Sequence, residues 1–270
     1  MNHVSRPLLC VRHPPRLRLV QVAGVERISP RMRRITFAGD ELAGFTSAAA
    51  DDHVKLFFPA PGQDRPALPD PGANGSSPAD AIRPVVRDYT PRRFDPGRCE
   101  LVVEFVIHGD GPASTWAAQA APGQWIGVGG PRGSILTPDD CDAYLLIGDE
   151  TALPAIARHL EEMPPGVPAL VLIEVADARE ERHLPTAANA AIRWLHRDGI
   201  AAGTTTLLEQ ALRNLMLPGG DTYAWLAGEI ETARRLRRYL IEEESLSRDR
   251  VRAAGYWRVG DAGTHAGLDD

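Results

Sequence analysis

Arg87-Asp88-Tyr89-Thr90-Pro91-Arg92 brings an aromatic ring, a hydroxyl group and guanidinium groups together on one short segment. In an extended chain, residues i and i+2 share a face, so Arg87 and Tyr89 can contact one ligand together while Thr90 points to a different edge. A flat redox ring with a pyrophosphate tail needs a stacking surface, a polar contact and a cation for the phosphates. Arginine can supply this cation, because its guanidinium binds phosphate through bidentate hydrogen bonds. The same alternation of Arg and Tyr is also common on a solvated strand face, so the surrounding sequence has to distinguish the two interpretations.

The first half of the chain predicts an antiparallel β-barrel. Apolar runs rich in β-branched and aromatic residues, separated by Gly, Pro and Asp, predict six short strands over 17–25, 32–37, 54–58, 85–90, 99–107 and 125–128. Residues 59–84 contain seven prolines and three glycines, which predicts a long flexible insertion between two of these strands. A short helix is expected over 115–120, with Ser114 as its N-cap.

The second half predicts a parallel sheet with crossover helices. Continuous apolar runs predict strands over 144–147, 170–175, 192–195 and 223–227. Helical patterns alternate with them over 153–163, 206–215 and 230–243. Strands that alternate with helices are typical of parallel sheets. We expect a first domain over 1–139, which includes the insertion, and a second domain over 140–270.

Composition excludes several classes of protein. The net charge is −6 and no basic block is present, which argues against a nucleic-acid-binding surface. Residues 1–15 lack the apolar core of a signal peptide, and no run approaches the roughly 20 apolar residues of a membrane span. The three cysteines form no C-x-x-C pair, which argues against an iron–sulfur or structural zinc site. We therefore expect a cytoplasmic protein with reduced thiols and no metal site of its own.

The hexapeptide resembles the R-x-Y-T flavin motif of the ferredoxin–NADP reductase superfamily. With Arg92 included, it resembles the siderophore-interacting protein family of FAD-dependent ferric-siderophore reductases. Other segments agree with this family in order and spacing, and the resemblance extends over about 16–260: His53-Val54-Lys55-Leu56, His108-Gly109-x-Gly111-Pro112-Ala113-Ser114-x-Trp116, Gly130-Pro131-x-Gly133, Gly148-Asp149-Glu150-Thr151-Ala152-Leu153-Pro154, Trp225-x-Ala227-Gly228-Glu229 and Gly255-Tyr256-Trp257-Arg258. It implies a six-stranded FAD-binding barrel followed by an NAD(P)-binding α/β domain.

The resemblance also implies an activity. Hydride would pass from nicotinamide to the flavin, and single electrons would then reduce Fe³⁺ held by a siderophore, without an iron site on the protein. We expect a monomer that uses FAD as its cofactor, NAD(P)H as its electron donor and a ferric siderophore as its substrate. Three alternatives stay open: a flavin reductase on the same fold, a ferredoxin-linked oxidoreductase, and a siderophore-binding flavoprotein without turnover.

Residue roles follow from the same resemblance. Tyr89 and Thr90 are expected at the reacting edge of the flavin. The cofactor-binding residues are expected to be Arg87, Tyr89, Thr90, Arg92, His108, Gly111, Pro112, Ala113, Ser114, Asp149, Thr151, Ala152 and Glu229. Lys55 is the only lysine among the 30 basic residues, and with Arg132 and Arg258 it is expected to attract anionic ferric chelates.

The segment after the first parallel strand carries acids and no G-x-G-x-x-G pattern. Asp149 and Thr151 can hydrogen-bond ribose hydroxyls or the flavin, or can cap the following helix, whereas two acids beside a phosphate are unfavourable. Tryptophans 116, 194 and 257 are expected to fill the core. The choice between NADH and NADPH stays open, because Asp177 and Glu180 accompany the arginines that could meet a 2′-phosphate, Arg179, Arg182 and Arg197.

Overall fold

The computed structural model describes residues 8–69, 84–109, 111–261 and 266–267. The chain folds into two compact units. We call 11–48 with 52–134 the barrel unit, and 1–10 with 49–51 and 135–270 the parallel-sheet unit. The boundary expected between domains at 139/140 stays a prediction. A separate two-stranded sheet pairs β1 (Cys10–Arg12) with β9 (Gly133–Ile135).

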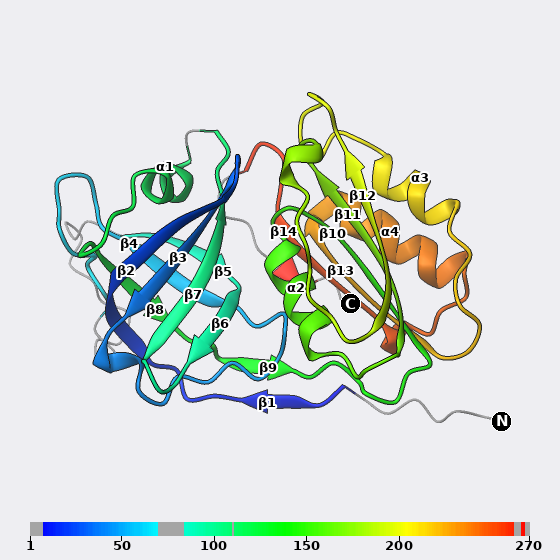
Figure 1. Ribbon diagram of the computed structural model, residues 1–270, viewed down its shortest axis with the longest axis horizontal. Helices are drawn as coiled ribbons and strands as arrows, with labels where there is room; N and C mark the ends of the chain where they lie inside the picture. Colours follow the sequence, from blue (N-terminus) through cyan, green and yellow to red (C-terminus); the bar gives the residue numbers. More distant parts are fainter. Residues whose placement is uncertain (1–7, 70–83, 110, 262–265, 268–270) are drawn as a thin grey trace. The chain divides into compact units, whose positions relative to one another are not determined.

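The barrel unit is built from one antiparallel sheet whose two edges are consecutive in sequence. Its strand order is β5-β4-β8-β2-β3-β7-β6. The edge strands β5 (Val85–Tyr89) and β6 (Pro91–Asp95) are joined through Thr90 alone, so the sheet has to curl back on itself (Figure 1). The other strands are β2 (Leu17–Ser29), β3 (Met32–Ala38), β4 (Val54–Phe58), β7 (Glu100–Val106) and β8 (Trp125–Gly129).

The sheet has seven strands where six are predicted, and the additional strand is β6. Pro91 interrupts the sequence pattern, so the sequence does not predict a strand that begins there. A proline is nevertheless tolerated as the first residue of an edge strand, because the missing N–H faces no partner there. The predicted antiparallel architecture is confirmed, and the strand count is corrected.

The barrel core follows the alternation of its strands. Leu101, Val103 and Phe105 of β7 point inward and are fully buried. The helix α1 (Pro112–Ala118) packs on this core through Trp116, whose ring centroid lies 5.3 Å from that of Phe58 and 6.0 Å from that of Phe105. The expected core role of Trp116 is confirmed.

The predicted start of this helix is wrong. It begins at Pro112 rather than at 115, and Gly111 is its N-cap. Proline is favoured at the first helical position, where its missing N–H costs nothing. Ser114 lies inside the helix and is not its cap, since its hydroxyl oxygen accepts a hydrogen bond from the His108 N–H at 2.9 Å.

Part of the predicted insertion over 59–84 packs on the barrel. The Arg65 guanidinium lies over the Trp125 ring, 4.2 Å from its centroid, and Pro66 is buried. The Leu68 side chain occupies the space that a Cβ atom at Gly127 would need. Residues 70–83, the middle of the insertion, lie outside the described residues.

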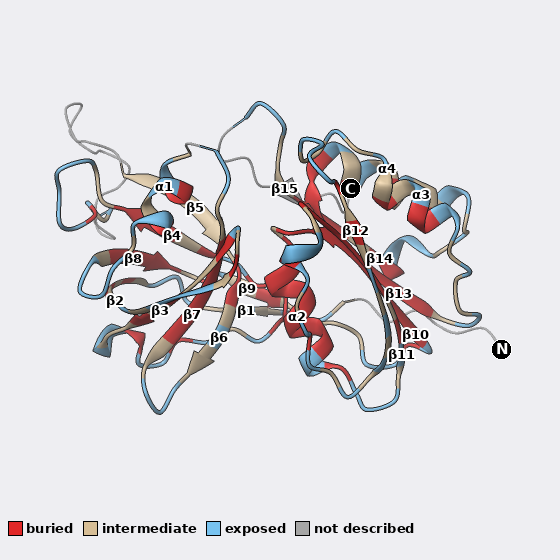
Figure 2. Ribbon diagram, turned by 45° about the horizontal axis from the view of Figure 1, so that its top comes forward, coloured by how far each residue is buried: buried red, intermediate tan, exposed pale blue. Residues whose placement is uncertain are grey.

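The parallel-sheet unit has the strand order β12-β11-β10-β13-β14-β15. Helix α2 covers one face of this sheet, and α3 and α4 cover the other (Figure 1). The core is deeply buried along the central strands (Figure 2). The elements are β10 (Ala143–Asp149), α2 (Leu153–Glu162), β11 (Pro168–Val175), β12 (Asn189–His196), α3 (Leu207–Arg213), β13 (Thr222–Glu229), α4 (Ile230–Glu242), β14 (Val251–Trp257) and β15 (Ala266–Gly267). Within the described ranges, no helix combines the length and the apolar character that crossing a membrane requires.

The predicted parallel sheet is confirmed, but the strand predicted over 223–227, which is β13, is not its last parallel strand. β14 pairs with β13 in parallel. This strand is absent from the predicted set because its first residues are Val251-Arg252-Ala253-Ala254-Gly255. Ala and Gly have low strand propensity, so only the neighbouring strand β13 makes this segment extended.

Gly148 lets three elements meet at the end of β10. A Cβ atom there would lie 2.8 Å from the Ala227 carbonyl oxygen of β13 and 2.4 Å from the Ala152 Cβ at the start of α2. The first of these atoms belongs to the backbone and cannot rotate away.

We therefore expect Gly148→Ala to lower the free energy of unfolding by about 1–3 kcal/mol or more, as overpacking of a tight site does. Urea denaturation measures this change. Gly219→Ala is the matched control, because a Cβ at that exposed glycine meets no atom within 4 Å. Equal stability of the two variants would contradict the close approach of β10, β13 and α2.

Candidate functional site

In the barrel unit, the polar motif of residues 87–92 lies at the junction between the two edge strands, β5 and β6. The Tyr89 ring contacts Phe105, with 4.4 Å between the ring centroids. Burial raises the pKa of the Tyr89 phenol, and Arg87 opposes this shift only partly, so the phenol is neutral and can donate a proton in a hydrogen bond. Thr90 is buried between the two edge strands.

The strand β5, which leads to this point, carries a cation and contacts a helix that has free backbone donors. Arg87 is half-buried, and its Nη1 donates to the neighbouring Val86 carbonyl at 2.8 Å. Helix α1 packs against β5, the strand that carries Arg87. Its first turn leaves backbone N–H groups without intrahelical partners, including those of Ala113 and Ser114.

The approach to this first turn is open. A Cβ atom added to Gly109 or Gly111 would meet no atom of the described residues within 4 Å. His108 is exposed at the end of β7, and its backbone is held by Ser114. An uncovered glycine-lined turn beside a half-buried guanidinium fits a pyrophosphate, and the neighbouring aromatic ring fits a flat ring system. The residues present therefore fit FAD.

Arg92, the last residue of the motif, points to a carboxylate. Its Nε lies 3.7 Å from Oε1 of Glu104, and its side chain is 12% exposed. This ion pair makes a direct contact between Arg92 and a cofactor phosphate less favourable than the sequence indicates.

The three expected substrate-binding cations differ in their surroundings. Lys55 forms an ion pair across the β4–β5 pair, with its Nζ 2.9 and 3.2 Å from the two carboxylate oxygens of Asp88. Arg132 is exposed and follows Gly129, the residue that pairs with Lys55 in β8. Arg258 belongs to the parallel-sheet unit, where its Nη2 lies 3.3 Å from Glu231.

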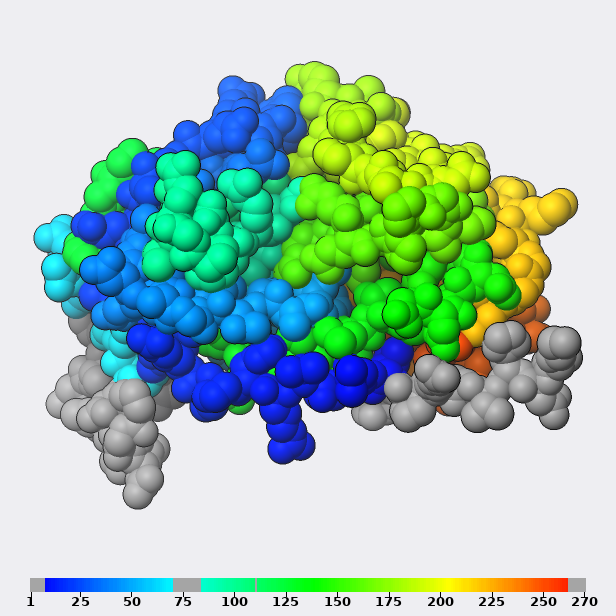
Figure 3. Space-filling model, turned by 60° about the horizontal axis from the view of Figure 1, so that its bottom comes forward, coloured from blue at the N-terminus to red at the C-terminus, as the bar shows by residue number. Residues whose placement is uncertain are grey.

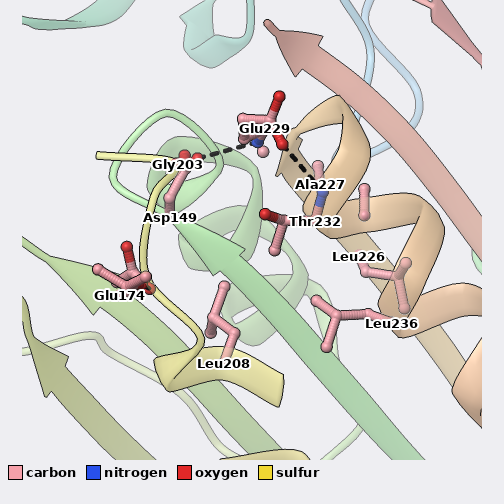
Figure 4. A pocket seen from close by; sticks show the side chains of 12 residues that line it. Asp149, Glu174, Gly203, Leu208, Leu226, Ala227, Glu229, Thr232 and Leu236 are labelled. Atoms are coloured by element: carbon pink, nitrogen blue, oxygen red, sulfur yellow. Dashed lines mark hydrogen bonds between the residues drawn. The ribbon is translucent and has the colours of Figure 1, made fainter. Parts of the chain in front are cut away.

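The parallel-sheet unit contains a pocket at the carboxyl ends of its strands (Figure 4). Ligands bind at this edge of open α/β sheets. The pocket holds about 350 Å³ of empty space, part of it open to solvent. Carboxylates and hydroxyls supply its polar lining: Asp149, Glu174, Glu229, Thr205 and Thr232. The described lining contains no basic residue.

Asp149 collects hydrogen bonds at the centre of this edge. Its carboxylate accepts from the Thr151 N–H at 2.8 Å, from the Glu229 N–H at 3.1 Å and from Trp257 Nε1 at 2.7 Å. Burial and the charge of Glu150 raise its pKa from 3.8 to about 6, and these hydrogen bonds limit the rise. The sequence predicts only a core role for Trp257. The structure shows that its partly buried indole N–H, which needs an acceptor, donates to Asp149.

Glu229 occupies the start of α4. Its carboxylate accepts hydrogen bonds from the Glu231 and Thr232 N–H groups, each at 2.9 Å. The N-terminus of a helix attracts anions, and here the anion is a side chain of the same protein. A nucleotide phosphate would have to displace it.

A buried arginine links two further carboxylates that the motifs do not indicate. Arg197 donates to Glu150 through both Nη atoms, and its Nη1 lies 3.4 Å from Glu174. Arg197 is therefore not a free partner for a 2′-phosphate. Arg179, a second candidate, is held by both carboxylate oxygens of Asp177 at 2.9 and 2.8 Å.

The raised pKa of Asp149 predicts a pH dependence of stability. The native state holds a proton on this carboxyl up to about pH 6, whereas the unfolded state releases it near pH 4. The contribution of Asp149 to stability is thus full below about pH 4 and is lost as the pH rises to about 6. Asp149→Asn cannot titrate.

We expect the free energy of unfolding of Asp149→Asn, relative to that of the wild type, to rise between pH 4 and pH 7 by on the order of 1–3 kcal/mol. Urea denaturation at several pH values measures this difference, with Glu242→Gln at an exposed position as the control. A constant difference between Asp149→Asn and wild type would show that the carboxyl titrates normally.

Comparisons with known proteins agree with this geometry. A model of the siderophore-interacting FAD-binding domain matches residues 21–135, and a model of the siderophore-interacting protein matches residues 141–260. The chain is 38% identical to the NADPH-dependent ferric-chelate reductase of Escherichia coli strain K12, covering 96% of this chain and 100% of the relative. It is 32% identical to the ferric vibriobactin reductase of Vibrio cholerae, covering 90% of each.

Solved structures give the same result. A siderophore utilization protein from T. fusca has a TM-score of 0.87 and 42% identity, covering 95% of this chain and 98% of that one. The siderophore-interacting protein SipS from Aeromonas hydrophila has a TM-score of 0.77 and 31% identity, covering 93% and 94%. The chain therefore belongs to the siderophore-interacting protein family, as its motifs indicate.

Proposed function

We propose that this protein is an FAD-dependent reductase that transfers electrons from NAD(P)H to ferric siderophores and releases Fe(II). The observation that supports the proposal is the packing of α1 against β5, the strand that carries Arg87 and Tyr89 and is followed directly by Thr90. Relatives that match most of this chain are named as reductases of ferric chelates and of ferric vibriobactin. We assign FAD binding to residues 1–139 and donor binding to residues 140–270.

Bound FAD would accept hydride and release single electrons. Arg87 and the backbone N–H groups of Gly111, Ala113 and Ser114 would hold the pyrophosphate by charge-assisted hydrogen bonds. The Tyr89 ring would stack against the flat flavin, and its neutral hydroxyl would add no charge there. The buried Thr90 hydroxyl would supply a polar contact to the ring, and His108, which follows β7, would border the site.

The pocket of the parallel-sheet unit suits the hydroxyl and amide groups of a nucleotide donor. Asp149, Thr151 and Glu229 can accept hydrogen bonds from ribose hydroxyls or from a carboxamide, whereas the charges of the two carboxylates, Asp149 and Glu229, repel phosphate. Ala152 is fully buried against Gly148 and shapes this turn. Ferredoxin as an alternative donor and the monomeric state stay predictions.

Anaerobic reduction tests the function directly. Purified protein with bound FAD is mixed with NADH or NADPH, and the visible absorption of the flavin is followed. Ferric siderophore is then added, and Fe(II) is trapped with a colorimetric chelator. We expect the flavin band to bleach and then to return with stoichiometric Fe(II).

Each rival function gives a different outcome. Reduction of free flavin without reduction of ferric siderophore would favour a flavin reductase. Bleaching by reduced ferredoxin alone would favour a ferredoxin-linked enzyme. A flavin that neither donor reduces would favour a siderophore-binding protein without turnover.

Arg87 provides the first specific prediction. Arg87→Ala removes a charge-assisted contact worth about 1.5–3 kcal/mol, so we expect the dissociation constant of FAD to rise roughly ten- to hundredfold. Fluorescence titration of the FAD-free protein measures this constant. Arg93→Ala, an exposed arginine on the neighbouring strand β6, should leave it unchanged. Similar losses in both variants would show that Arg87 acts only through the general charge of the surface.

The second prediction concerns the capture of anionic chelates by Lys55 and Arg132, with Arg258 as the third cation. Because Asp88 neutralises Lys55, we expect Arg132→Glu to raise the apparent KM more than Lys55→Glu does. Asp88→Asn should lower KM by releasing Lys55. These effects should shrink as salt rises, since exposed charges are screened.

Steady-state rates with anionic and neutral ferric chelates measure these effects. Arg98→Glu is the control, because Arg98 is a 71% exposed cation of the barrel unit outside the motifs. An equal change for neutral chelates would contradict electrostatic capture, and so would a slower reduction of the flavin by NAD(P)H.

A further inference from the structure

The edge strand β6 begins with an irregular residue. Pro91 pairs with Val103 of β7, Arg93 pairs with Val102, and the register shifts between them. Arg92 is therefore the additional residue of a β-bulge. Bulges bend a strand and redirect a side chain, and they are frequent beside active sites. This bulge lies shortly after Thr90, where the chain leaves one edge of the sheet and enters the other.

The redirected side chain meets a buried carboxylate. Glu104 points away from the barrel core, because its neighbours Val103 and Phe105 belong to the core, and yet its side chain has no exposed surface. Its Oε1 lies 3.7 Å from Nε of Arg92. The same oxygen accepts hydrogen bonds from Nε and Nη2 of Arg34 at 3.1 and 2.7 Å.

One carboxylate thus connects three neighbouring strands. Arg34 lies directly opposite Glu104 in the β3–β7 pair, and Arg92 reaches it from β6 on the other side. The blue-green residues around the β6–β7 pair are visible on the surface of the barrel unit in Figure 3. Pairing with β7 on one side, and packing of Phe94 against Phe45 at 5.0 Å between ring centroids, hold this edge strand. A buried charge has to keep its partners, because removing one of them leaves an uncompensated ion. Glu104 therefore specifies where Arg92, and with it the bulge, can lie.

Glu104 also connects the two parts of the proposed FAD site. β7 carries Glu104 and then leads through His108 to the first turn of α1. β6 carries Arg92 and is preceded directly by Tyr89 and Thr90. A displacement of the bulge would move this pair of residues relative to the donors at the start of α1.

We propose that Glu104 is a positioning residue for the flavin site: by holding Arg92 in the bulge, it places Tyr89 and Thr90 opposite the first turn of α1. Arg92 serves this geometry and does not bind the pyrophosphate directly. The inference rests on the proposed binding of FAD. Arg34 shares the carboxylate but lies on the side away from the motif, so it stabilises the sheet without setting the site.

Two double-mutant cycles on the full-length protein test this assignment. One combines Arg92→Gln with Glu104→Gln, and the other combines Arg34→Gln with Glu104→Gln. Each variant is measured for the dissociation constant of FAD, for the visible circular dichroism of the bound flavin, and for the melting temperature of the FAD-free protein. Glu26→Gln is the control, since Glu26 is an exposed carboxylate that lies 3.4 Å from Arg34. Glu104→Asp keeps the charge on a shorter side chain.

We expect Arg92→Gln and Glu104→Gln each to weaken FAD binding at least tenfold and to alter the flavin dichroism, with no further loss in the double variant. Glu104→Asp should recover part of the affinity. Arg34→Gln should lower the melting temperature but change FAD affinity less than twofold, and Glu26→Gln should change neither.

Additive losses of Arg92→Gln and Glu104→Gln would overturn the inference, because they would show that Arg92 contacts FAD independently. FAD losses that merely follow the melting temperature across all variants would overturn it too, since they would indicate a general structural role. If Glu104→Gln fails to fold, Arg92→Gln and Glu104→Asp decide between the same outcomes. Wild-type protein that does not bind FAD would overturn the proposed function and this inference together, whereas failure of the cycles alone leaves the proposed function intact.

Discussion

The closure of the barrel sheet is the constraint on which the first half of the molecule depends. Two strands that follow each other through a single residue, Thr90, form the opposite edges of one antiparallel sheet. A sheet can satisfy that connection only by curling until its edges meet. The residues at the junction are then held by hydrogen bonds and side chains on both sides. The flavin motif occupies this junction, which explains how a short segment can have a defined geometry.

The two units differ in the polar groups that they offer to a ligand. The barrel unit offers guanidinium and backbone N–H groups near its motif, which suits an anionic pyrophosphate. The pocket of the parallel-sheet unit offers Asp149, Glu174 and Glu229, which suits hydroxyl and amide donors. In both units a buried ion is shared between two partners of opposite charge: Glu104 lies between two arginines, and Arg197 lies between two glutamates. Such sharing keeps each buried charge next to groups of opposite charge.

Strong local patterns predict most of the architecture from the sequence. The alternating strands of the barrel and the continuous apolar strands β10, β11 and β13 have periodicities that tertiary contacts only reinforce. The misses have local causes. Pro91 interrupts the sequence pattern of β6, and the Ala and Gly residues of 253–255 have low strand propensity, so the sequence predicts neither β6 nor β14. Each of these strands is extended because it pairs with a neighbouring strand, β6 with β7 and β14 with β13. Pro112 moves the start of α1 ahead of its predicted cap.

By itself, the sequence determined the order of the motifs, the family and the residue types available for binding flavin and nucleotide. Only the tertiary structure decided which of those charges are already paired. The register of β4 and β5 places Asp88 against Lys55, and the packing of β10, β11 and β12 encloses Arg197 between two glutamates. The turn from β13 into α4 lets Glu229 occupy the helix start. Pairing of this kind depends on strand register and on contacts between residues far apart in the chain, and neither is encoded in the spacing of a motif.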